Sequence, residues 1–501
     1  MRLKIASRQS DLAKIQSYTV AAALCRAQSN IEIEFEFRLS FGDRHLDIPM
    51  DGAQEKGLFT QDFYEGLKAG QFDMVIHSWK DLPVESRPGT SVVATLPRAD
   101  VRDLLLVKKT SCEKKKWQVL SSSPRRSYNL QSTLGKLFPG EPRIEFAPIR
   151  GNILTRLNKL MDSKGDALIL AKAAMDRLLE AREAEFAQCQ KAVRQILSSC
   201  NWSVLPLAIN PAAAAQGALA IEIADNRPEL VELLKKIQCQ NTFDEAQRER
   251  QILASYGGGC HQKIGVTVLH RDYGEILILR GLTDSGTQLN QISLQRDFYS
   301  KHWQAREEEM FPVPSSLSQW YERRPIHLPT PDPSKGVWVA RAEAFPKQWQ
   351  DQQFNVIWTS GLKSWQSLAR RGIWVNGCAE SMGEQEDPRV ETLCGQRIQW
   401  LKLTHQDGYR GKIPVLATYQ LKPKQPPPLL EAKTYFYWMS GSSFKRAQKL
   451  YPGIIANSFH GCGPGNTFRI LQKQVSAERL RLFLNYDDWY MSLTKGEQED
   501  G

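Results

Sequence analysis

Residues 3–39, LKIASRQSDLAKIQSYTVAAALCRAQSNIEIEFEFRL, pass from a short apolar run into an amphipathic stretch and back into an alternating run. The runs LKIA and IEIEFEFRL predict strands, and DLAKIQSYTVAAALCRAQ between them predicts a helix. The same alternation continues with LFTQDFYEGLKAG at 58–70 and FDMVIHS at 72–78. Strands that alternate with helices are typical of a layered α/β domain, whose functional loops follow the strands.

A second group of apolar runs comes next. QVLSSS at 118–123, RIEFAPI at 143–149 and GDALILA at 165–171 predict further strands, with helices between them. Two α/β lobes with a cleft are therefore expected. After Asp244, a helical run, a glycine-rich turn and alternating strands predict a smaller α+β domain.

The composition limits the classes of protein to consider. The 501 residues suffice for several cores. The charged N-terminus lacks the apolar segment of a signal peptide, and prolines and polar residues interrupt the most apolar stretch, so we expect a cytoplasmic protein without membrane spans. Nine scattered cysteines predict neither a disulfide framework nor a metal site. No nucleic-acid-binding motif accompanies the net charge of +11, so no nucleic acid partner is expected.

Two short motifs lie where predicted strands end. Arg8 and Ser10 of RQS precede a helix, whose N-terminus favours an anion, and the Arg8 guanidinium suits a carboxylate. In HSWKDLPVE, Lys80 and Asp81 follow the run DMVIHS, at the edge where α/β sheets bind ligands. Taken alone, the motifs also fit a solvated arginine beside a helix cap and a salt-bridged structural aspartate.

Four arginines follow predicted strands of the second lobe: Arg125 and Arg126 in SSSPRRS, and Arg150 and Arg156 in PIRGNILTR. The guanidinium fork matches carboxylates, so together they indicate a ligand with several carboxylate groups. Phosphate is the competing ligand, but the chain has no GxxxxGK[ST] loop. Solvated surface arginines remain the alternative without a ligand.

Three glycines precede Cys260 in YGGGCHQKIG. Glycine carries no side chain, so this loop leaves room for a bulky group to approach the sulfur. A cysteine packed in a core would not need that clearance.

Seven motifs in a fixed order resemble the hydroxymethylbilane synthase family, also called porphobilinogen deaminase: RQS, EKGLF, HSWKDLPVE, SSSPRR, IRGNILTRL, PAAAAQGALAIE and GGGCHQKIG. The resemblance covers roughly the first 300 residues. It implies two periplasmic-binding-protein-like lobes and a small α+β domain. The implied boundaries are 1–95 with 203–235 for domain 1, 96–202 for domain 2, and 238–304 for domain 3 with the cofactor cysteine.

The resemblance also implies the roles of individual residues. Cys260 would carry a dipyrromethane cofactor through a thioether, and Asp81 would be the catalytic carboxylate that stabilises the cation formed when ammonia leaves. The implied cofactor-binding residues are Lys80, Ser123, Arg125, Arg126 and Arg150. The implied substrate-binding residues are Arg8, Ser10, Phe59, Arg156 and Gln216.

The reaction implied is the stepwise condensation of four porphobilinogen molecules, with loss of ammonia, into a linear tetrapyrrole. The partners are therefore porphobilinogen and the growing chain, and we expect a monomer. Three segments depart from the family pattern: AQEKGLF, SPRR and CHQKIG.

The last third contains a repeat, in which FNVIWTSGLKSWQSLARRGI resembles KTYFYWMSGSSFKRAQKLYPGI. A proline-rich stretch, 305–335, predicts a semi-extended connector before it. Four segments, VWVARAE, VIWTSGLKSW, PVLATYQLKP and YFYWMSGSSFKRA, resemble uroporphyrinogen-III synthase, over about residues 336–474. The resemblance implies a bilobal α/β region, 336–501, and cyclisation of the tetrapyrrole. The implied ligand contacts there are Thr359, Ser360, Tyr419, Ser440 and Ser442.

Two other functions remain open. The chain fits a synthase whose C-terminal region is degenerate and serves only as a scaffold. It also fits a non-enzymatic, two-lobed protein that binds carboxylates, although such a protein would not need Cys260 in a glycine loop.

Overall fold

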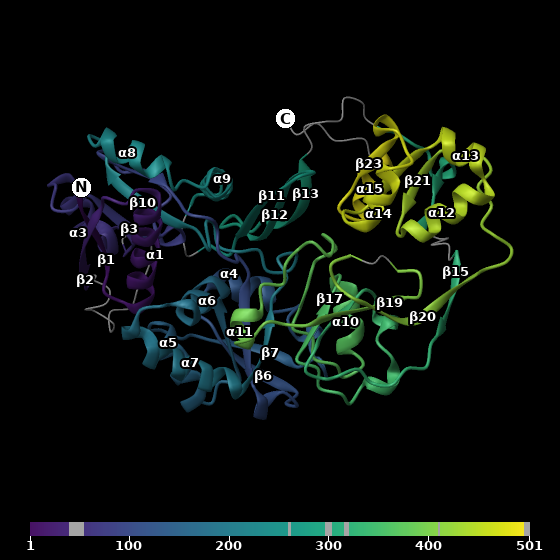
Figure 1. Cartoon of the computed structure of the whole chain (residues 1–501), viewed down its shortest axis with the longest axis horizontal. Coiled ribbons are helices and arrows are strands. Elements are labelled where there is room, and N and C mark those ends of the chain that lie inside the picture. Colours follow the sequence, from purple (N-terminus) through teal and green to yellow (C-terminus); the bar gives the residue numbers. More distant parts are fainter. Residues whose placement is uncertain (40–54, 259–261, 296–302, 315–319, 409–410, 495–501) are drawn as a thin grey trace.

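The computed structural model describes residues 1–39, 55–258, 262–295, 303–314, 320–408 and 411–494, with side chains in helix α3 described from residue 61 onward (Figure 1). The fold is mixed α/β, as the alternation of strands and helices predicts, and the described residues form five sheets. In the described part of the chain, no helix has both the length and the apolar character needed to cross a bilayer.

The first sheet, with its helices, forms lobe 1. Its strand order is β2-β1-β3-β10-β4, with β10 antiparallel to both of its neighbours. Leu3 and Ile5 pack on one face of the sheet with α1 and α8, whereas Ala6 packs on the other face with α3, so helices cover both faces. The elements are β1 (Arg2–Arg8), α1 (Asp11–Ala27), β2 (Glu32–Arg38), α3 (Glu55–Lys68), β3 (Met74–Ser78), β4 (Thr90–Ala94), β10 (Leu219–Ala224) and α8 (Pro228–Lys235).

The second sheet forms lobe 2 with the order β7-β6-β8-β5-β9. Its central strand β8, ALILA, is buried at every position, as expected for a strand with both faces covered. The elements are β5 (Asp103–Lys108), β6 (Lys116–Leu120), α4 (Pro124–Leu130), β7 (Arg143–Ala147), α5 (Ile153–Asp162), β8 (Ala167–Ala171), α6 (Lys172–Glu180), α7 (Ala187–Ser198) and β9 (Cys200–Val204).

Two segments, 95–102 and 205–218, connect the lobes, and we call them the crossing segments. They touch at Gly217, whose carbonyl accepts the N–H of Ala99 at 3.3 Å. Gly217 has φ +87°, and an added Cβ would lie 2.7 Å from the Ala99 oxygen, so only glycine fits this contact.

The third sheet is an antiparallel meander of β11 (Gly265–Arg271), β12 (Gly274–Leu282) and β13 (Gln288–Gln295), packed against α9 (Gln240–Ser255). Glu249 of α9 is fully buried and accepts two hydrogen bonds from Arg98, at 2.9 and 2.7 Å. It also accepts the N–H groups of Ala215 and Val268. This carboxylate therefore joins both crossing segments to the small domain.

The last third of the chain forms the fourth and fifth sheets, with strand orders β15-β20-β19-β16-β17-β18 and β14-β21-β22-β23. The predicted repeat of strand, loop and helix is confirmed, because β17 leads into α10 and β21 leads into α12; the second unit adds α13 before its next strand, β22. The fourth sheet and its helices comprise β15 (Tyr321–Pro325), β16 (Gly336–Val339), β17 (Val356–Thr359), α10 (Leu362–Ala369), β18 (Gly377–Cys378), α11 (Glu391–Cys394), β19 (Trp400–His405) and β20 (Val415–Pro423). The fifth comprises β14 (Met310–Phe311), β21 (Tyr435–Trp438), α12 (Gly441–Leu450), α13 (Pro452–Asn457), β22 (Phe459–Cys462), α14 (Asn466–Gln472), β23 (Leu480–Leu482) and α15 (Tyr486–Thr494).

The segment 305–335, for which the sequence predicts only a connector, supplies an edge strand to each of these two sheets. β14 pairs with β21, and β15 pairs with β20. The sequence gives no strand signal for β15, because its residues, YERRP, do not alternate between apolar and polar. In the structure they are exposed or half-buried.

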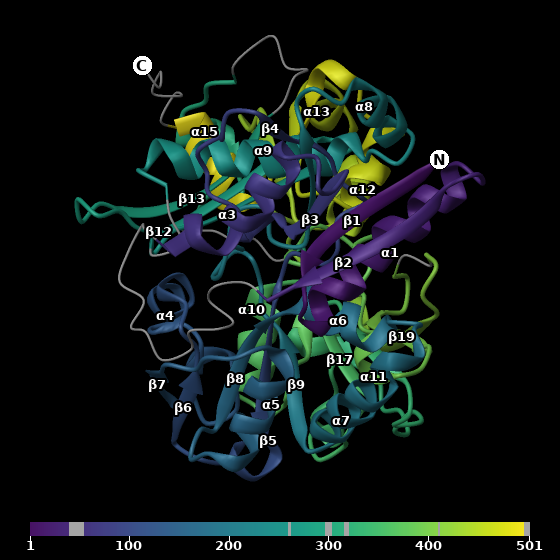
Figure 2. The same ribbon diagram turned by 90° about the vertical axis from the view of Figure 1, so that its left-hand side faces the viewer.

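Lobe 2 and the fourth sheet share a hydrophobic core. Phe138 of lobe 2 packs against Trp365 and Trp374, and the Trp365 indole donates to the Leu137 carbonyl at 2.6 Å. Both views show α10 and β17 beside the strands of lobe 2 (Figures 1 and 2). The N-terminal and C-terminal parts of the chain are thus packed together rather than tethered only by a linker.

Candidate active site

Most of the predicted site residues follow parallel strands at the carboxyl edges of the two lobes. Arg8 ends β1, and Lys80 and Asp81 lie in the short 3₁₀ turn Trp79–Asp81 after β3, which is parallel to β1. Arg125 and Arg126 follow β6, and Arg150 follows β7. Because parallel strands present their carboxyl ends at one edge, polar side chains gather there.

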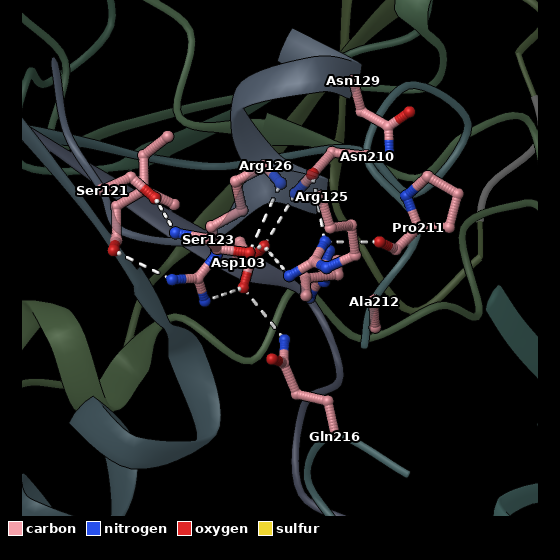
Figure 3. Close-up of polar contacts among 12 residues, drawn as sticks. Asp103, Ser121, Ser123, Arg125, Arg126, Asn129, Asn210, Pro211, Ala212 and Gln216 are labelled. Carbon is pink, nitrogen blue, oxygen red and sulfur yellow. Dashed lines mark hydrogen bonds and ion pairs between the residues drawn. The ribbon is translucent and has the colours of Figure 1, made fainter. Parts of the chain in front are cut away.

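A buried ionic cluster centred on Asp103 dominates the lobe 2 side (Figure 3). Arg126 donates from Nε and Nη2 to the two Asp103 oxygens at 2.9 and 2.7 Å, and Arg125 donates from Nη2 at 2.9 Å. The side-chain amides of Asn210 and Gln216 donate to the same carboxylate at 2.8 and 2.9 Å. The two arginines therefore lie in the first turn of α4, in contact with Asp103, and not at solvated loop tips.

Asp103 holds its charge because of these donors. Its side chain is fully buried, and burial alone would raise the pKa of the carboxyl group. The guanidinium groups of Arg126 and Arg125 outweigh that effect and hold the pKa far below its usual range. The cluster contains two cations and one anion. It therefore retains net positive charge beside the second crossing segment, 205–218, which supplies Asn210 and Gln216.

Gln216 links this cluster to lobe 1. Its amide group donates to the Val101 carbonyl and to Asp103, and its oxygen accepts from Lys80 Nζ at 3.3 Å. Burial lowers the pKa of Lys80, an effect that the neighbouring Asp81 opposes. The Asp81 side chain is exposed. An accessible carboxylate thus lies beside a cation whose deprotonation it disfavours.

Two more arginines near the cluster are paired with carbonyl groups. Arg156 donates from Nε to Gly151 O at 2.7 Å, and Arg177 donates from Nη2 to Gly217 O at 2.7 Å. Burial lowers the pKa of both guanidinium groups, to about 10 for Arg177. Within the described part of the chain, neither forms an ion pair. Desolvated cations whose hydrogen-bond acceptors are carbonyl groups suit an anionic ligand.

Cys260 lies outside the described residues, but α9 and the residues up to Gly258 are described. Arg250 of α9 donates to the carbonyl groups of Trp79 and Leu82 at 3.4 and 3.2 Å, and also to Pro83. A Cβ added at Gly258 would lie 3.6 Å from Val84 Cβ. The glycine loop that leads to Cys260 therefore begins against the loop that carries Asp81.

The remaining predicted residues have various local roles. The Ser123 hydroxyl accepts the Arg126 N–H at 3.4 Å and caps α4. Ser10 is at the N-cap position of α1 without a side-chain cap bond. The Arg150 carbonyl accepts a hydrogen bond from Lys159 at 3.1 Å. Phe59 belongs to α3, but its side chain lies outside the described residues.

A separate cavity of about 840 Å³ lies between the fourth and fifth sheets. Tyr419, Ser440 and Ser442 line it. Thr359 and Ser360, expected to do the same, do not. The Thr359 hydroxyl donates to Gly361 O, and the Ser360 hydroxyl accepts from the Trp338 indole, so both hydroxyl groups are engaged within the fourth sheet and its following loop.

The residues that sequence reasoning missed are Asp103, Asn210, Arg177, Glu249 and Arg250. Asp103 starts the apolar run DLLLVK, where a buried carboxylate requires a partner, but its arginines lie 22 and 23 residues away. Arg177 follows the strand-like run ALILA, so the strand-to-helix pattern that marked the other arginines would have found it.

Comparison with known proteins identifies the N-terminal part. Residues 3–232 match the family described as "Porphobilinogen deaminase, dipyromethane cofactor binding domain". A porphobilinogen deaminase of Synechococcus sp. (strain CC9902) is 33% identical over 286 residues, which are 56% of this chain and 83% of that protein. One of Lachnospira eligens is 33% identical over 281 residues, 55% of this chain and 87% of that protein.

Among solved structures, a probable amino-acid ABC transporter extracellular-binding protein of Bacillus subtilis aligns with 12% identity and a TM-score of 0.26, over 51% of this chain and 97% of that chain. A likeness this low adds nothing to the assignment. The relatives match along most of their own length, and the matched domain binds the dipyrromethane cofactor that a cysteine carries covalently in this family. Through its N-terminal part, the chain belongs to the porphobilinogen deaminase family.

Proposed function

We propose that the N-terminal part is a hydroxymethylbilane synthase, which condenses four porphobilinogen molecules into a linear tetrapyrrole with loss of ammonia. The observation that carries the proposal is the exposed Asp81 carboxylate, which interacts electrostatically with two partly buried cations, Lys80 and Arg156. The division into domains at 1–95 with 203–235, 96–202 and 238–304 is part of the proposal. The eight described cysteines are free, which suits the cytoplasm.

The side chains present fit a polycarboxylate cofactor. Cys260 would hold dipyrromethane through a thioether, and the acetate and propionate groups would meet Lys80, Ser123, Arg125, Arg126 and Arg150. Arg126 retains N–H donors that Asp103 and Ile169 do not use, so it can bind a second carboxylate. The cofactor supplies the pyrrole end to which substrate units are added.

Asp81 is the proposed catalytic residue. Its carboxylate would accept the pyrrole N–H of porphobilinogen and stabilise the positive charge that develops as ammonia leaves. Arg8, Ser10, Phe59 and Arg156 would bind the substrate. Gln216 would act by holding Lys80, because its amide group is already engaged by Val101 and Asp103.

Intact mass and turnover test this function. The purified chain should carry a covalent dipyrromethane and convert porphobilinogen to a linear tetrapyrrole. Cys260→Ser should lose both properties, whereas Cys25→Ser, at an exposed thiol, should keep them. An unmodified wild-type chain that binds carboxylates without turnover would favour the non-enzymatic alternative.

We propose as a second function that residues 336–501 cyclise the tetrapyrrole, as uroporphyrinogen-III synthase does. Six cationic side chains line the cavity between the fourth and fifth sheets against one carboxylate, Asp407, which suits a ligand with many carboxylates. The six are Arg323, Arg341, Lys402, Lys445, Arg469 and Lys473. Burial lowers the pKa of the Arg341 guanidinium group, and an anionic ligand in the cavity would oppose that effect.

The isomer ratio of the product tests the second function. Incubation with porphobilinogen followed by oxidation should yield predominantly uroporphyrin III, whereas spontaneous closure yields isomer I. Arg341→Ala should shift the product toward isomer I. Arg324→Ala, at an exposed position outside the cavity, should not. Isomer I from the wild-type chain would restrict catalysis to the N-terminal part.

A further inference from the structure

A segment of the C-terminal region, residues 375–390, packs against the N-terminal part, and we call it the clamp. It begins beside β9, where Val204 N–H donates to the Asn376 carbonyl at 2.8 Å. The Asn376 side chain donates in turn to Trp202 O at 3.0 Å, and the Ser203 hydroxyl donates to Val375 O at 2.7 Å. The clamp is therefore fixed at the start of the second crossing segment.

Glu380 makes the most specific contact of the clamp. Its two carboxylate oxygens accept the backbone N–H groups of Leu207 and Ala208, at 2.9 and 2.7 Å. These donors belong to a turn, 206–210, in which Pro206 O accepts the N–H groups of Ile209 and Asn210. A carboxyl group from the C-terminal region thus accepts two backbone N–H groups of the second crossing segment at once.

The turn that Glu380 holds leads directly into the ionic cluster. Asn210 donates to Asp103 at 2.8 Å and accepts from Arg125 Nη1 at 3.1 Å. The Pro211 carbonyl accepts from the same Nη1 at 2.5 Å (Figure 3). Movement of the turn would therefore move two of the groups that orient Arg125 and Asp103.

Two further contacts extend the clamp to other parts of the N-terminal enzyme. Arg102, at the end of the first crossing segment, donates to Pro388 O at 3.0 Å. Arg271 of the small domain forms an ion pair with Glu386, at 2.7 Å from Nε. One segment thus contacts both connections between the lobes and the domain that carries Cys260.

The backbone of the clamp is held in an unusual conformation. Glu380 and Ser381 have φ of +47° and +66°, in the left-handed region that non-glycine residues rarely adopt. The Ser381 N–H donates to Ser360 O at 2.7 Å, and an added Cβ on Gly361 would lie 2.8 Å from Ser381 Oγ. Such strain persists where the surroundings impose it, and in this conformation the Glu380 carboxylate reaches the N–H groups of Leu207 and Ala208.

We infer that Glu380 is a positioning residue for the N-terminal enzyme: it holds the turn 206–210, and through Asn210 and Pro211 the Asp103–Arg125–Arg126 cluster, in place. The C-terminal region is on this view a working part of the synthase, whether or not it cyclises the product. The expected effect on kcat rests on the proposed synthase function. The effect of Glu380 on the turn 206–210 can be measured without turnover.

The test compares Glu380→Ala with wild type in the full-length chain. Hydrogen exchange of the Leu207 and Ala208 amides should become at least about tenfold faster, since both lose their acceptor. With porphobilinogen, kcat should fall roughly three- to tenfold while KM stays within about twofold, because the displaced arginines contact the cofactor and not the incoming substrate. Glu431→Ala, an exposed change of equal charge in the same region, should alter neither.

Glu380→Gln gives a graded comparison, since its amide keeps one acceptor oxygen. Glu380→Gln should keep one of the two amides protected from exchange and should retain a higher kcat than Glu380→Ala. If the alanine variant does not fold, the comparison of Glu380→Gln with wild type is the test. Unchanged exchange of both amides, or faster exchange with unchanged kcat, would overturn the inference. A wild-type chain without turnover would refute the proposed function, while the exchange experiment would still test the coupling.

Discussion

Arg126 and Asp103 form a bidentate ion pair, with Nε 2.9 Å from Oδ2 and Nη2 2.7 Å from Oδ1. The pair joins α4 to the first residue of β5 and receives Arg125, Asn210 and Gln216 as further partners. Its geometry determines where the two arginines can present their remaining donors. The stability of lobe 2 and the shape of the site thus depend on one carboxylate.

Asp103→Asn should destabilise the protein by about 3–5 kcal/mol, because it leaves two buried guanidinium groups without a counter-ion. Chemical denaturation followed by fluorescence would measure the change. Asp162→Asn, at an exposed position at the end of α5, should change the free energy of unfolding by less than about 0.5 kcal/mol. Equal effects of the two substitutions would contradict the role assigned to Asp103.

Asp81→Ala should reduce turnover of porphobilinogen by ~10²–10⁴ without changing the fold, because the side chain is exposed and acts on the reacting groups. Initial rates and circular dichroism would be measured together. Asp284→Ala, in an exposed turn of the small domain, is the matched control. Near-normal rates for Asp81→Ala would remove this residue from catalysis.

Phe138→Ala should destabilise the fourth sheet as well as lobe 2. The ring is fully buried and packs against Trp365 and Trp374 of the C-terminal region, so its loss should cost about 3–5 kcal/mol. Hydrogen exchange should accelerate in β17 and α10 together with β6. Phe63→Ala, equally buried but within lobe 1, should leave the fourth sheet protected. Acceleration confined to lobe 2 would argue against a shared core.

The stability of the fifth sheet should decrease as the pH falls from about 6.5 to about 4. Burial lowers the pKa of His460 to about 4, and its Nδ1 accepts the Trp438 indole N–H at 3.0 Å. A pKa below that of the unfolded chain means that neutral His460 stabilises the fold above pH 6.5. That contribution is lost as the imidazole protonates, because Nδ1–H would then face another donor.

Thermal unfolding across this pH range would measure the effect, which is at most roughly 3 kcal/mol. His460→Gln should flatten the dependence, whereas His327→Gln, at an exposed position, should leave it unchanged. A wild-type unfolding curve that is independent of pH between 4 and 6.5 would show that His460 does not titrate in this way.

Much of the N-terminal site could be predicted from the sequence because its signals are local. Strand LKIA and the following helix, the 3₁₀ turn with Lys80 and Asp81, and the start of α4 each depend on residues within a few positions. Alternation of apolar residues, capping residues and proline act over this short range. The strand ends, and therefore the polar residues that follow them, could be predicted without a structure.

The tertiary structure decided which charges meet. In the sequence, Arg125 and Arg126 predict a ligand with carboxylate groups. In the folded chain both form ion pairs with Asp103, because a cation removed from water needs a counter-ion. The contact of Glu380 with Leu207 and Ala208 spans more than 170 residues and has no local signal. The local pattern of residues did not indicate the edge strands β14 and β15, but it indicated most of the other helices and strands and the types of residue at the N-terminal site. Only the packing of distant segments decided their partners, since burial and pairing depend on neighbours in space.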